Sequence, residues 1–592
     1  MSGLRPRVEA VRTAVRHLVG RGDCLGCRLA EATGGRSRRR RGDDLGHRLA
    51  QVVEGRRRTR VAVLARDSRV ERALADAAPS IDVTTFDPGT EDWHDRLAVH
   101  GAIEVVLETG AHDGQPVEAL GASLFALGLQ GLYLVSPEAA DRPGPRRGRT
   151  LRQTVARLLE IQQQDEVGEL SHPHRGTSRS DRTHLADSIA SVEDRPGYLA
   201  VRKRRRSLAK LDEARADAWL DAGEGRRGRV LLREDAAPVP RLARILENES
   251  HRSDRFEPNP EAPAPTLREY DGPFCAPGQV VGARGVLLPD TYRHLTRQRL
   301  INRYVVDLAP DWGRPATPVK DPERLPGTYY YLDSEFRGHF GHAMTEQVSR
   351  FWGWEEAQRR DPDVKALVGV NAGRTSLAAF ELELFAAAGI PADRIELIDS
   401  PVRPERLIGA TPLFDNPRYV HPRIVGEWAG LSERLAAKAP DGDRPRRLFC
   451  SRRTVHTSPG AFKGQRRVCH NGAEVEAWFR ERGFTVVFTE DYTMAEQAAL
   501  FRGAEIVAGY AGSALFNLIF TTQPIRVVLI SSESYTAQNE FLISSALGHE
   551  VHTVYCPADI PRRPREWSSA AFNSAFTVDL DRDRDFLERA VS

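Results

Sequence analysis

Two histidines and a carboxylate are spaced so that they could share one face of a helix. His339, His342 and Glu346 lie at i, i+3 and i+7 of residues 339–354, which we expect to be helical. A positioned imidazole or carboxylate can take the proton of an attacking hydroxyl group, so we place catalysis or binding of that hydroxyl first. A structural helix with buried, hydrogen-bonded histidines is the second interpretation. A metal site is last, because the spacing is not HExxH and no distant ligand is evident.

Farther along the chain, cations and glycines are arranged for binding a diphosphate. Arg452 and Arg453 follow the apolar run 448–451, which we expect to be a buried strand, and Gly512 and Ser513 open a helix after a second predicted strand at 506–509. Free backbone N–H groups at a helix start accept an anion, and guanidinium groups bind phosphate oxygens. The alternative is a tight strand-to-helix turn beside two solvated arginines. Spacing alone does not decide between these interpretations.

The elements that position these residues predict an α/β fold. Over residues 446–520 the pattern gives strands at 448–451, 485–488 and 506–509, separated by helices at 474–482 and 495–501. Such alternation forms parallel sheets, which bind ligands beyond the carboxyl ends of their strands. A strand predicted at 329–332 precedes Asp333 and the histidine helix, so those residues should lie at an edge of the same kind.

Together these segments resemble glycosyltransferase family 61. The similarity covers roughly residues 270–592, and its carboxyl-terminal part consists of SRR at 451–453, Arg467, Asn471, GFTVVF, AEQAALFRGAEIVAG and GSALFNLIF. Its amino-terminal part is a GHxxxE motif followed by an arginine, formed by Gly341, His342, Glu346 and Arg350. The sequence departs from the family pattern at Ala511, where many members have histidine, and at Gly472, where an acid commonly follows the asparagine.

The resemblance implies an inverting glycosyltransferase with two Rossmann-like lobes of the GT-B type. His342 and Glu346 would be catalytic, with Asp333 and His339 on the acceptor side. The donor, a UDP-linked nucleotide sugar, would be held by Arg452, Arg453, Arg467, Asn471, Gly512, Ser513 and Asn517. The acceptor would be a glycan or lipid-linked glycan, in surface or capsular polysaccharide synthesis, and neither a cofactor nor a metal is expected. A non-catalytic nucleotide- or glycan-binding scaffold is the alternative, and a metal-dependent hydrolase is a third.

The length of 592 residues predicts several domains. Residues 1–140 would hold a basic helix and a small Rossmann-like α/β domain, which vaguely resembles a methyltransferase half but lacks a glycine-rich loop, so we assign it no cofactor. Residues 141–264, rich in charge and proline, would be a linker with surface helices. The two transferase lobes would follow at 265–435 and 436–592.

Composition narrows the class of protein. The net charge of +3 does not favour nucleic acid as a partner. Six cysteines in this length are too few for a disulfide framework, and no apolar stretch approaches the ~20 residues of a membrane span. We therefore expect a cytoplasmic protein. The basic amphipathic pattern near the amino terminus allows a peripheral contact with the inner face of the membrane, although packing on the following domain is the simpler interpretation.

Overall fold

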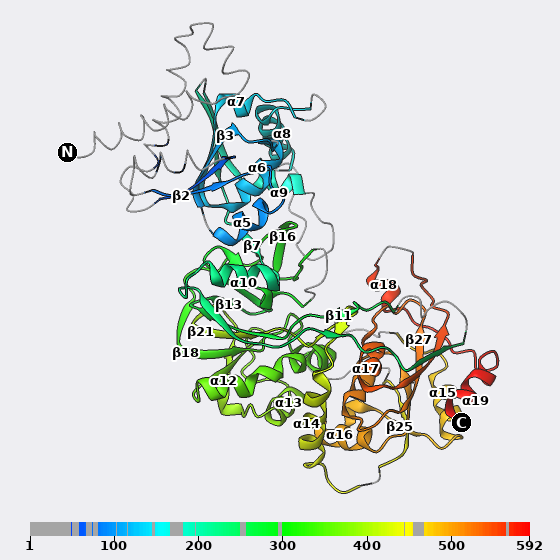
Figure 1. Ribbon diagram of the computed structural model, residues 1–592. Coiled ribbons are helices and arrows are strands. Elements are labelled where there is room, and N and C mark those ends of the chain that lie inside the picture. The colour runs from blue at the N-terminus through cyan, green and yellow to red at the C-terminus, as the bar shows by residue number, and fades with distance from the viewer. Residues whose placement is uncertain are drawn as a thin grey trace, which may run out of the picture. The chain divides into compact units, whose positions relative to one another are not determined.

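The structure is a computed structural model, and its chain divides into two units (Figure 1). Unit 1 comprises residues 1–227, 281–291 and 297–318, and unit 2 comprises 228–280, 292–296 and 319–592. The structure describes residues 49, 52, 59–66, 71, 74, 81–101, 103–114, 116–144, 148–165, 181–195, 197–248, 256–293, 299–442, 444–453, 467–563 and 567–592. The basic amino-terminal helix expected from the sequence, with Cys24 and Cys27, lies outside these residues. Within them, no helix has the length and apolarity to cross a membrane.

Unit 1 is built on a six-stranded sheet in the order β2-β1-β3-β4-β6-β5. The four apolar runs near the amino terminus form its parallel part: β1 (Thr59–Ala65), β2 (Ile81–Phe86), β3 (Ile103–Ala111) and β4 (Leu127–Val135). The helices α5 (Trp93–His100) and α6 (Pro116–Ala126) connect them. The hairpin of β5 (Ile189–Arg195) and β6 (Tyr198–Lys203) adds an antiparallel edge. This unit is therefore α/β, as expected.

The stretch 141–264 contains ordered elements where a charged linker with surface helices was expected. It contributes α8 (Leu151–Asp165) and α9 (Asp181–Asp187) as well as the β5–β6 hairpin. Within the basic run at 202–206, Arg204, Arg205 and Arg206 are exposed, but the Lys203 side chain is fully buried. Its ammonium group donates to the carbonyl oxygens of Phe125 and Leu127, each at 2.6 Å. Burial lowers the pKa of Lys203. Its hydrogen bonds to three acceptors explain how this amine can be buried inside the unit.

Unit 2 contains four adjacent parallel strands that belong to a larger mixed sheet. Its parallel strands run in the order β21 (Val402–Ala410), β18 (Glu323–Tyr331), β19 (Lys365–Gly369), β20 (Ile395–Ile398). The chain passes from β18 to β19 and β20, and then returns to place β21 on the other side of β18. That reversal marks the carboxyl ends of β18 and β21 as the edge where such sheets bind ligands.

The helical run after β18 changes type along its length. It begins as α11 (Phe340–His342), continues as a π-helix over Ala343–Gln347 and a 3₁₀-helix over Val348–Gly353, and ends as α12 (Trp354–Arg360). His339 is the residue before the first helical turn. The sequence predicted one regular helix over 339–354. A single π-turn inside a helical run is uncommon and is often found at functional sites.

The second sheet of unit 2 is parallel throughout. Its order is β10 (Arg244–Glu247), β28 (Glu550–Cys556), β27 (Arg526–Ser532), β26 (Ile506–Tyr510), β24 (Arg447–Cys450), β25 (Thr485–Val487). The helices α15 (Gly472–Arg480) and α16 (Met494–Arg502) flank β25 in the sequence. The strand order reverses between β24 and β26. The helix predicted from Ser513 is the 3₁₀-helix η8 (Ser513–Phe520).

The two sheets of unit 2 share one hydrophobic core. Tyr330 and Val368 of the first sheet belong to the same buried cluster as Val507 and Leu529 of the second. The helix α14 (Ile424–Ala436) packs against both α13 (Ala379–Ala387) and α16. Two strands that precede the expected boundary at residues 264 and 265 also belong here, because β8 (Gly228–Arg233) pairs with β12 (Thr266–Asp271) and β10 pairs with β28. Composition does not reveal which strands pair with each other, so the sequence did not predict that β8 and β10 belong to unit 2.

Candidate functional site

The imidazole of His342 contacts the carboxylate of Glu346 directly. His342 Nδ1 lies 2.7 Å from Glu346 Oε1, and the two side chains are 22% and 15% exposed. The ring of Phe336 stacks face to face on His342, with centroids 4.0 Å apart and planes 5° apart. When Nδ1–H donates to the carboxylate, the lone pair on Nε2 can accept a proton. The pair therefore has the geometry of an oriented general base.

Arg293 completes this cluster, and sequence reasoning missed it. Its Nη1 lies 3.0 Å from Glu346 Oε1, its Nε lies 3.2 Å from Glu335 Oε2, and its guanidinium carbon lies 4.7 Å from the Phe336 ring centroid. Burial lowers the pKa of Arg293, but the carboxylates of Glu346 and Glu335 outweigh burial and raise it overall. Arg293 thus holds the Glu346 carboxylate in place beside His342.

Asp333 has a structural role rather than the acceptor contact expected for it. Its side chain is fully buried and accepts four backbone N–H bonds, from Gly278 at 2.9 Å, Gln279 at 2.7 Å, Ser334 at 2.7 Å and Gly369 at 3.0 Å. Burial raises the pKa of Asp333, and these hydrogen bonds offset part of that rise. The carboxylate ties the end of β18 to β19 and leaves no room for a ligand, since a Cβ on Gly369 would lie 2.3 Å from it.

His339, also expected on the acceptor side, lies beside His342. The two rings meet edge to face, with centroids 4.8 Å apart and planes 66° apart. The last member of the family motif, Arg350, is 2% exposed, and its carbonyl oxygen accepts a hydrogen bond from the hydroxyl of Tyr330. The structure therefore brings His339, His342 and Glu346 together, while Arg350 belongs to the core beneath them.

At the second sheet, two arginines converge on Gly512. Arg452 follows β24 and Gly512 follows β26, so both lie where the strand order reverses. A Cβ on Gly512 would lie 2.9 Å from Nη2 of Arg452 and 3.3 Å from Nη2 of Arg467, and the φ of Gly512 is +147°. Only glycine lets both guanidinium groups approach this backbone. The sequence predicted this site from Arg452 and Gly512, and the resemblance added Arg467.

Carbonyl oxygens and aromatic rings contact the two guanidinium groups. Arg452 donates to the carbonyl oxygens of Arg467 at 3.0 Å and Ala511 at 2.9 Å. The guanidinium carbon of Arg467 lies 4.6 Å from the ring centroid of Tyr535 and 5.3 Å from that of Phe572. Burial and the neighbouring Arg467 lower the pKa of Arg452 to about 10, so it stays charged at neutral pH. Two adjacent, partly buried cations favour an anionic ligand.

Arg453 makes a different set of contacts. Its side chain is 49% exposed and forms an ion pair with Asp491, and its guanidinium carbon lies 4.6 Å from the ring centroid of Phe488. Nothing in these contacts places it beside Gly512. The sequence predicted Arg452 and Arg453 together at the diphosphate, whereas in the structure the arginine beside Arg452 at Gly512 is Arg467.

A buried carboxylate of the protein accepts the backbone N–H of Gly512, which the sequence predicted would bind an anion. The N–H of Gly512 donates to Oε1 of Glu540 at 2.6 Å, and Glu540 is 1% exposed. Burial raises the pKa of Glu540 to about 7, although the Gly512 hydrogen bond and the charges of Arg467 and Arg452 oppose that rise. Glu540 belongs to α17 (Asn539–Leu547) and could not be identified from sequence, because a glutamate in the first turn of a helix is ordinary.

The two asparagines implied by the resemblance are engaged within the protein. Asn471 donates to the carbonyl oxygen of Val578 at 2.9 Å and accepts its N–H at 3.0 Å. Asn517 is fully buried and donates to Gln497 at 2.8 Å and to the Ala514 carbonyl oxygen at 3.0 Å. Direct donor contact is therefore not available to Asn517 in this structure, and Asn471 fixes the segment around Val578.

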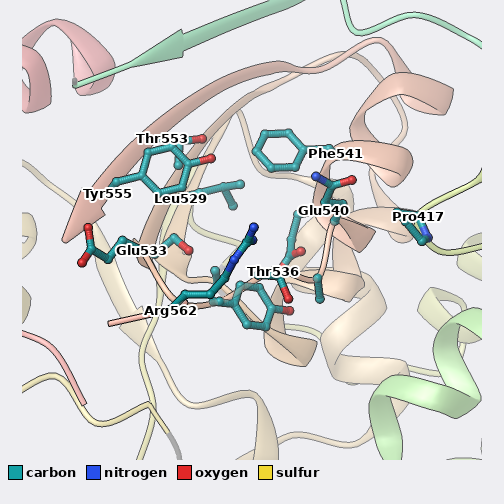
Figure 2. Close-up of a pocket in the computed structure, with 14 residues that line it drawn as sticks. Pro417, Leu529, Glu533, Thr536, Glu540, Phe541, Thr553, Tyr555 and Arg562 are labelled. Carbon is teal, nitrogen blue, oxygen red and sulfur yellow. The ribbon is translucent and has the colours of Figure 1, made fainter. Parts of the chain in front are cut away.

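A cavity of about 390 Å³ opens beside this arginine pair (Figure 2). It lies at the carboxyl ends of β27 and β28 and at the start of α17, and polar and aromatic side chains line it. Figure 2 shows Arg562 extending into the space that Glu540, Phe541 and Tyr555 surround. Ala511 and Glu540 line the cavity and also contact the Gly512 turn, so the two features are continuous.

The clusters of the two sheets meet at one close backbone contact. A Cβ on Gly341 would lie 3.0 Å from the Cβ of Ser513 and 3.1 Å from the ring of Phe516. The turn that carries His342 therefore packs directly on the first turn of η8. In the described residues no group of three or more His, Cys, Asp or Glu side chains could hold a metal ion.

One segment of the chain matches a known protein family. Residues 340–528 match the sequence model of the family described as Glycosyltransferase 61, which supports that assignment for a segment holding the His342 cluster and the Arg452–Gly512 turn. No curated protein matches the chain.

Among solved structures, the MycE methyltransferase from the mycinamycin biosynthetic pathway, in complex with Mg and SAH, is 15% identical over 27% of this chain and 47% of its own, with a TM-score of 0.21. The match thus spans about half the length of that protein. A Haemonchus contortus phosphoethanolamine N-methyltransferase 2 is 7% identical over 92% of this chain and 82% of its own, with a TM-score of 0.14. At these scores the matches carry no argument about this protein.

Proposed function

We propose that this protein is an inverting glycosyltransferase that moves a sugar from a nucleotide-sugar donor to a hydroxyl group of a glycan acceptor. The observation that carries the proposal is the convergence of Arg452 and Arg467 on Gly512 at the strand-order reversal of a parallel sheet. Parallel sheets bind nucleotides at such reversals, and paired guanidinium groups suit a diphosphate. The match of residues 340–528 to glycosyltransferase 61 supports the same reading.

In this proposal the diphosphate of the donor lies against Arg452 and Arg467. The nucleoside, which we take to be uridine, enters the cavity that Tyr555, Phe541 and Arg562 line. The cavity walls offer aromatic surface for a base and polar groups for a ribose. The two arginines stabilise the negative charge that develops on the leaving diphosphate as the bond to the anomeric carbon breaks.

The acceptor hydroxyl would lie at the His342 cluster. Its oxygen attacks the anomeric carbon while its proton passes to Nε2 of His342, and the bond from that carbon to the diphosphate oxygen breaks. Glu346 holds Nδ1–H at 2.7 Å and stabilises the imidazolium that forms. The contact between Gly341 and Ser513 brings the turn bearing this base to the start of η8. Attack from the side opposite the leaving group inverts the anomeric carbon.

The two-lobed GT-B arrangement and a role in surface or capsular polysaccharide synthesis, at the cytoplasmic face of the membrane, belong to the same proposal. Their support is the family match and the parallel strands in both sheets of unit 2. The alternative is a nucleotide- or glycan-binding scaffold without catalysis. The observation that favours it is the Glu540 carboxylate on the Gly512 amide, together with the internal bonds of Asn471 and Asn517.

Turnover tests the proposal. The full chain is incubated with a panel of UDP- and GDP-sugars, with and without glycan acceptors, and released nucleoside diphosphate is measured. A thermal-shift screen with UDP, GDP and their sugars comes first, because a ligand at 100 times its Kd stabilises the folded state by ~2.7 kcal/mol. Binding with release of diphosphate supports a transferase, and binding without release supports the scaffold. No stabilisation by any nucleotide contradicts both.

A further inference from the structure

The Gly512 turn holds two cations and one carboxylate in a confined space. The guanidinium groups of Arg452 and Arg467 flank Gly512, and Glu540 accepts the Gly512 N–H at 2.6 Å. Tyr535 also faces this group, since its ring underlies Arg467 and it lines the same cavity. A backbone N–H beside two guanidinium groups is the donor set that phosphate oxygens use. In this structure a carboxylate oxygen from the protein itself uses that N–H.

We propose that Glu540 is an internal competitor of the donor diphosphate: its carboxylate occupies the Gly512 amide and offsets part of the positive charge of Arg452 and Arg467, and it thereby sets the affinity for the donor. This inference rests on the proposed function. It goes beyond it by assigning a residue of α17, outside the matched segment 340–528, to the control of donor binding.

Burial makes the competition substantial. Glu540 is 1% exposed, so solvent hardly screens its charge from either arginine. A diphosphate that binds both guanidinium groups brings further negative charge beside this carboxylate. Two anions in one buried site disfavour each other, so donor binding must either displace the carboxylate or protonate it. The Glu540 pKa of about 7 makes protonation accessible near neutral pH.

The Glu540→Gln variant removes the charge of the side chain and keeps its shape. The amide oxygen of Glu540→Gln can still accept the Gly512 N–H, so the tie between α17 and the turn is kept while the charge is lost. Glu381 provides a matched control. It is 3% exposed, its carboxylate accepts the Ala378 N–H at 3.0 Å at the start of α13, and burial raises its pKa, yet it contacts neither arginine in the described contacts.

The experiment is calorimetric titration of the full chain with UDP and with inorganic pyrophosphate. The parent protein, E540Q and E381Q are compared at about pH 6 and about pH 8, on either side of the Glu540 pKa of about 7. We expect E540Q to bind roughly tenfold more tightly than the parent at the higher pH, a ratio that falls towards one at the lower pH. E381Q should bind as the parent does. Comparing variants at each pH cancels the ionisation of the ligands themselves.

The outcomes are distinguishable. If the parent binds and E540Q binds equally or more weakly at the higher pH, Glu540 is not a competitor, while the proposed function stands. If neither ligand binds any of the proteins, both the competitor and the proposed donor site are wrong. If E540Q does not fold, Glu540→Ala takes its place in the same titrations. Tighter binding of UDP than in the parent at the higher pH then supports the competitor, and equal or weaker binding overturns it.

Discussion

His342 and Glu346 are joined by a 2.7 Å contact between Nδ1 and Oε1, across a π-helical turn that begins at Ala343. The spacing i, i+4 places the two side chains on one face of the helical run. The Phe336 ring stacks on the imidazole and, together with the contact to Glu346, fixes its orientation. A histidine oriented by a carboxylate in this way is suited to repeated proton transfer.

His342→Ala and Glu346→Gln should bind UDP as the parent does and melt near the parent temperature, yet turn over far more slowly. Loss of a general base typically costs ~100- to 10,000-fold in rate. The measurement is kcat with the active nucleotide sugar, alongside calorimetry. His552→Gln is the control, since His552 also pairs with a glutamate, Glu550, but lies near the amino end of β28. Near-parent rates in both site variants would move the base elsewhere, with Glu335 next to be tested.

Arg452→Ala should weaken UDP binding by roughly 10- to 100-fold, because hydrogen bonds to charged groups contribute ~1.5 to 3 kcal/mol each. Arg453→Ala is a matched control one residue away, whose exposed side chain pairs with Asp491. It should change affinity less than about twofold, since exposed ion pairs contribute little. The measurement is the Kd for UDP, determined by calorimetry for both variants and the parent. Equal losses in the two variants would show that Arg453 also reaches the donor.

Arg293→Gln should lower kcat without raising the KM for the donor, because Arg293 positions Glu346 and lies in the cluster of the first sheet. Arg293→Lys should recover part of kcat, since an ammonium group can reach one carboxylate but not bridge two. Steady-state kinetics separate this role from a structural one: a merely structural arginine would lower the melting temperature and leave the kcat of the folded fraction unchanged.

Acid should destabilise the fold through His549. This residue is fully buried, Nδ1 accepts the N–H of Ile525 at 3.2 Å, and burial lowers its pKa from 6.5 to about 4. The unfolded chain binds the proton more readily, so the stabilisation is complete above about pH 6.5 and is lost as pH falls towards 4. The loss should reach about 2 kcal/mol by about pH 5.

Urea unfolding of the parent and of His549→Gln at several pH values measures this effect. The variant should show a shallower fall in the free energy of unfolding between about pH 6.5 and pH 5. His470→Gln serves as control, because its side chain is 52% exposed, and it should follow the parent. Parallel pH curves for the parent and His549→Gln would contradict the prediction.

Sequence patterns predicted the strands that precede the candidate residues and the sheet edges at which those residues gather. The strand predicted at 448–451 is β24, and that at 506–509 is β26. Apolar periodicity reports burial on one face of an element, and that property is local. The sequence also brought His342 and Glu346 together, since both lie on one helical run.

Roles that depend on distant partners could not be predicted. Glu540 meets Gly512 from 28 residues away, and Arg293 meets Glu346 from 53 away. Asp333 had the residue type and place of a ligand-binding group, but four backbone N–H groups converge on it. Composition also did not reveal that Lys203, in the stretch expected to be a charged linker, donates to buried carbonyl oxygens. Polar side chains take their roles from the tertiary contacts that satisfy them.

The close approach of Gly341 to Ser513 restricts the side chain that position 341 can carry. A methyl group there would lie 3.0 Å from the Cβ of Ser513 and 3.1 Å from the ring of Phe516, so alanine would force the turn that carries His342 away from the start of η8.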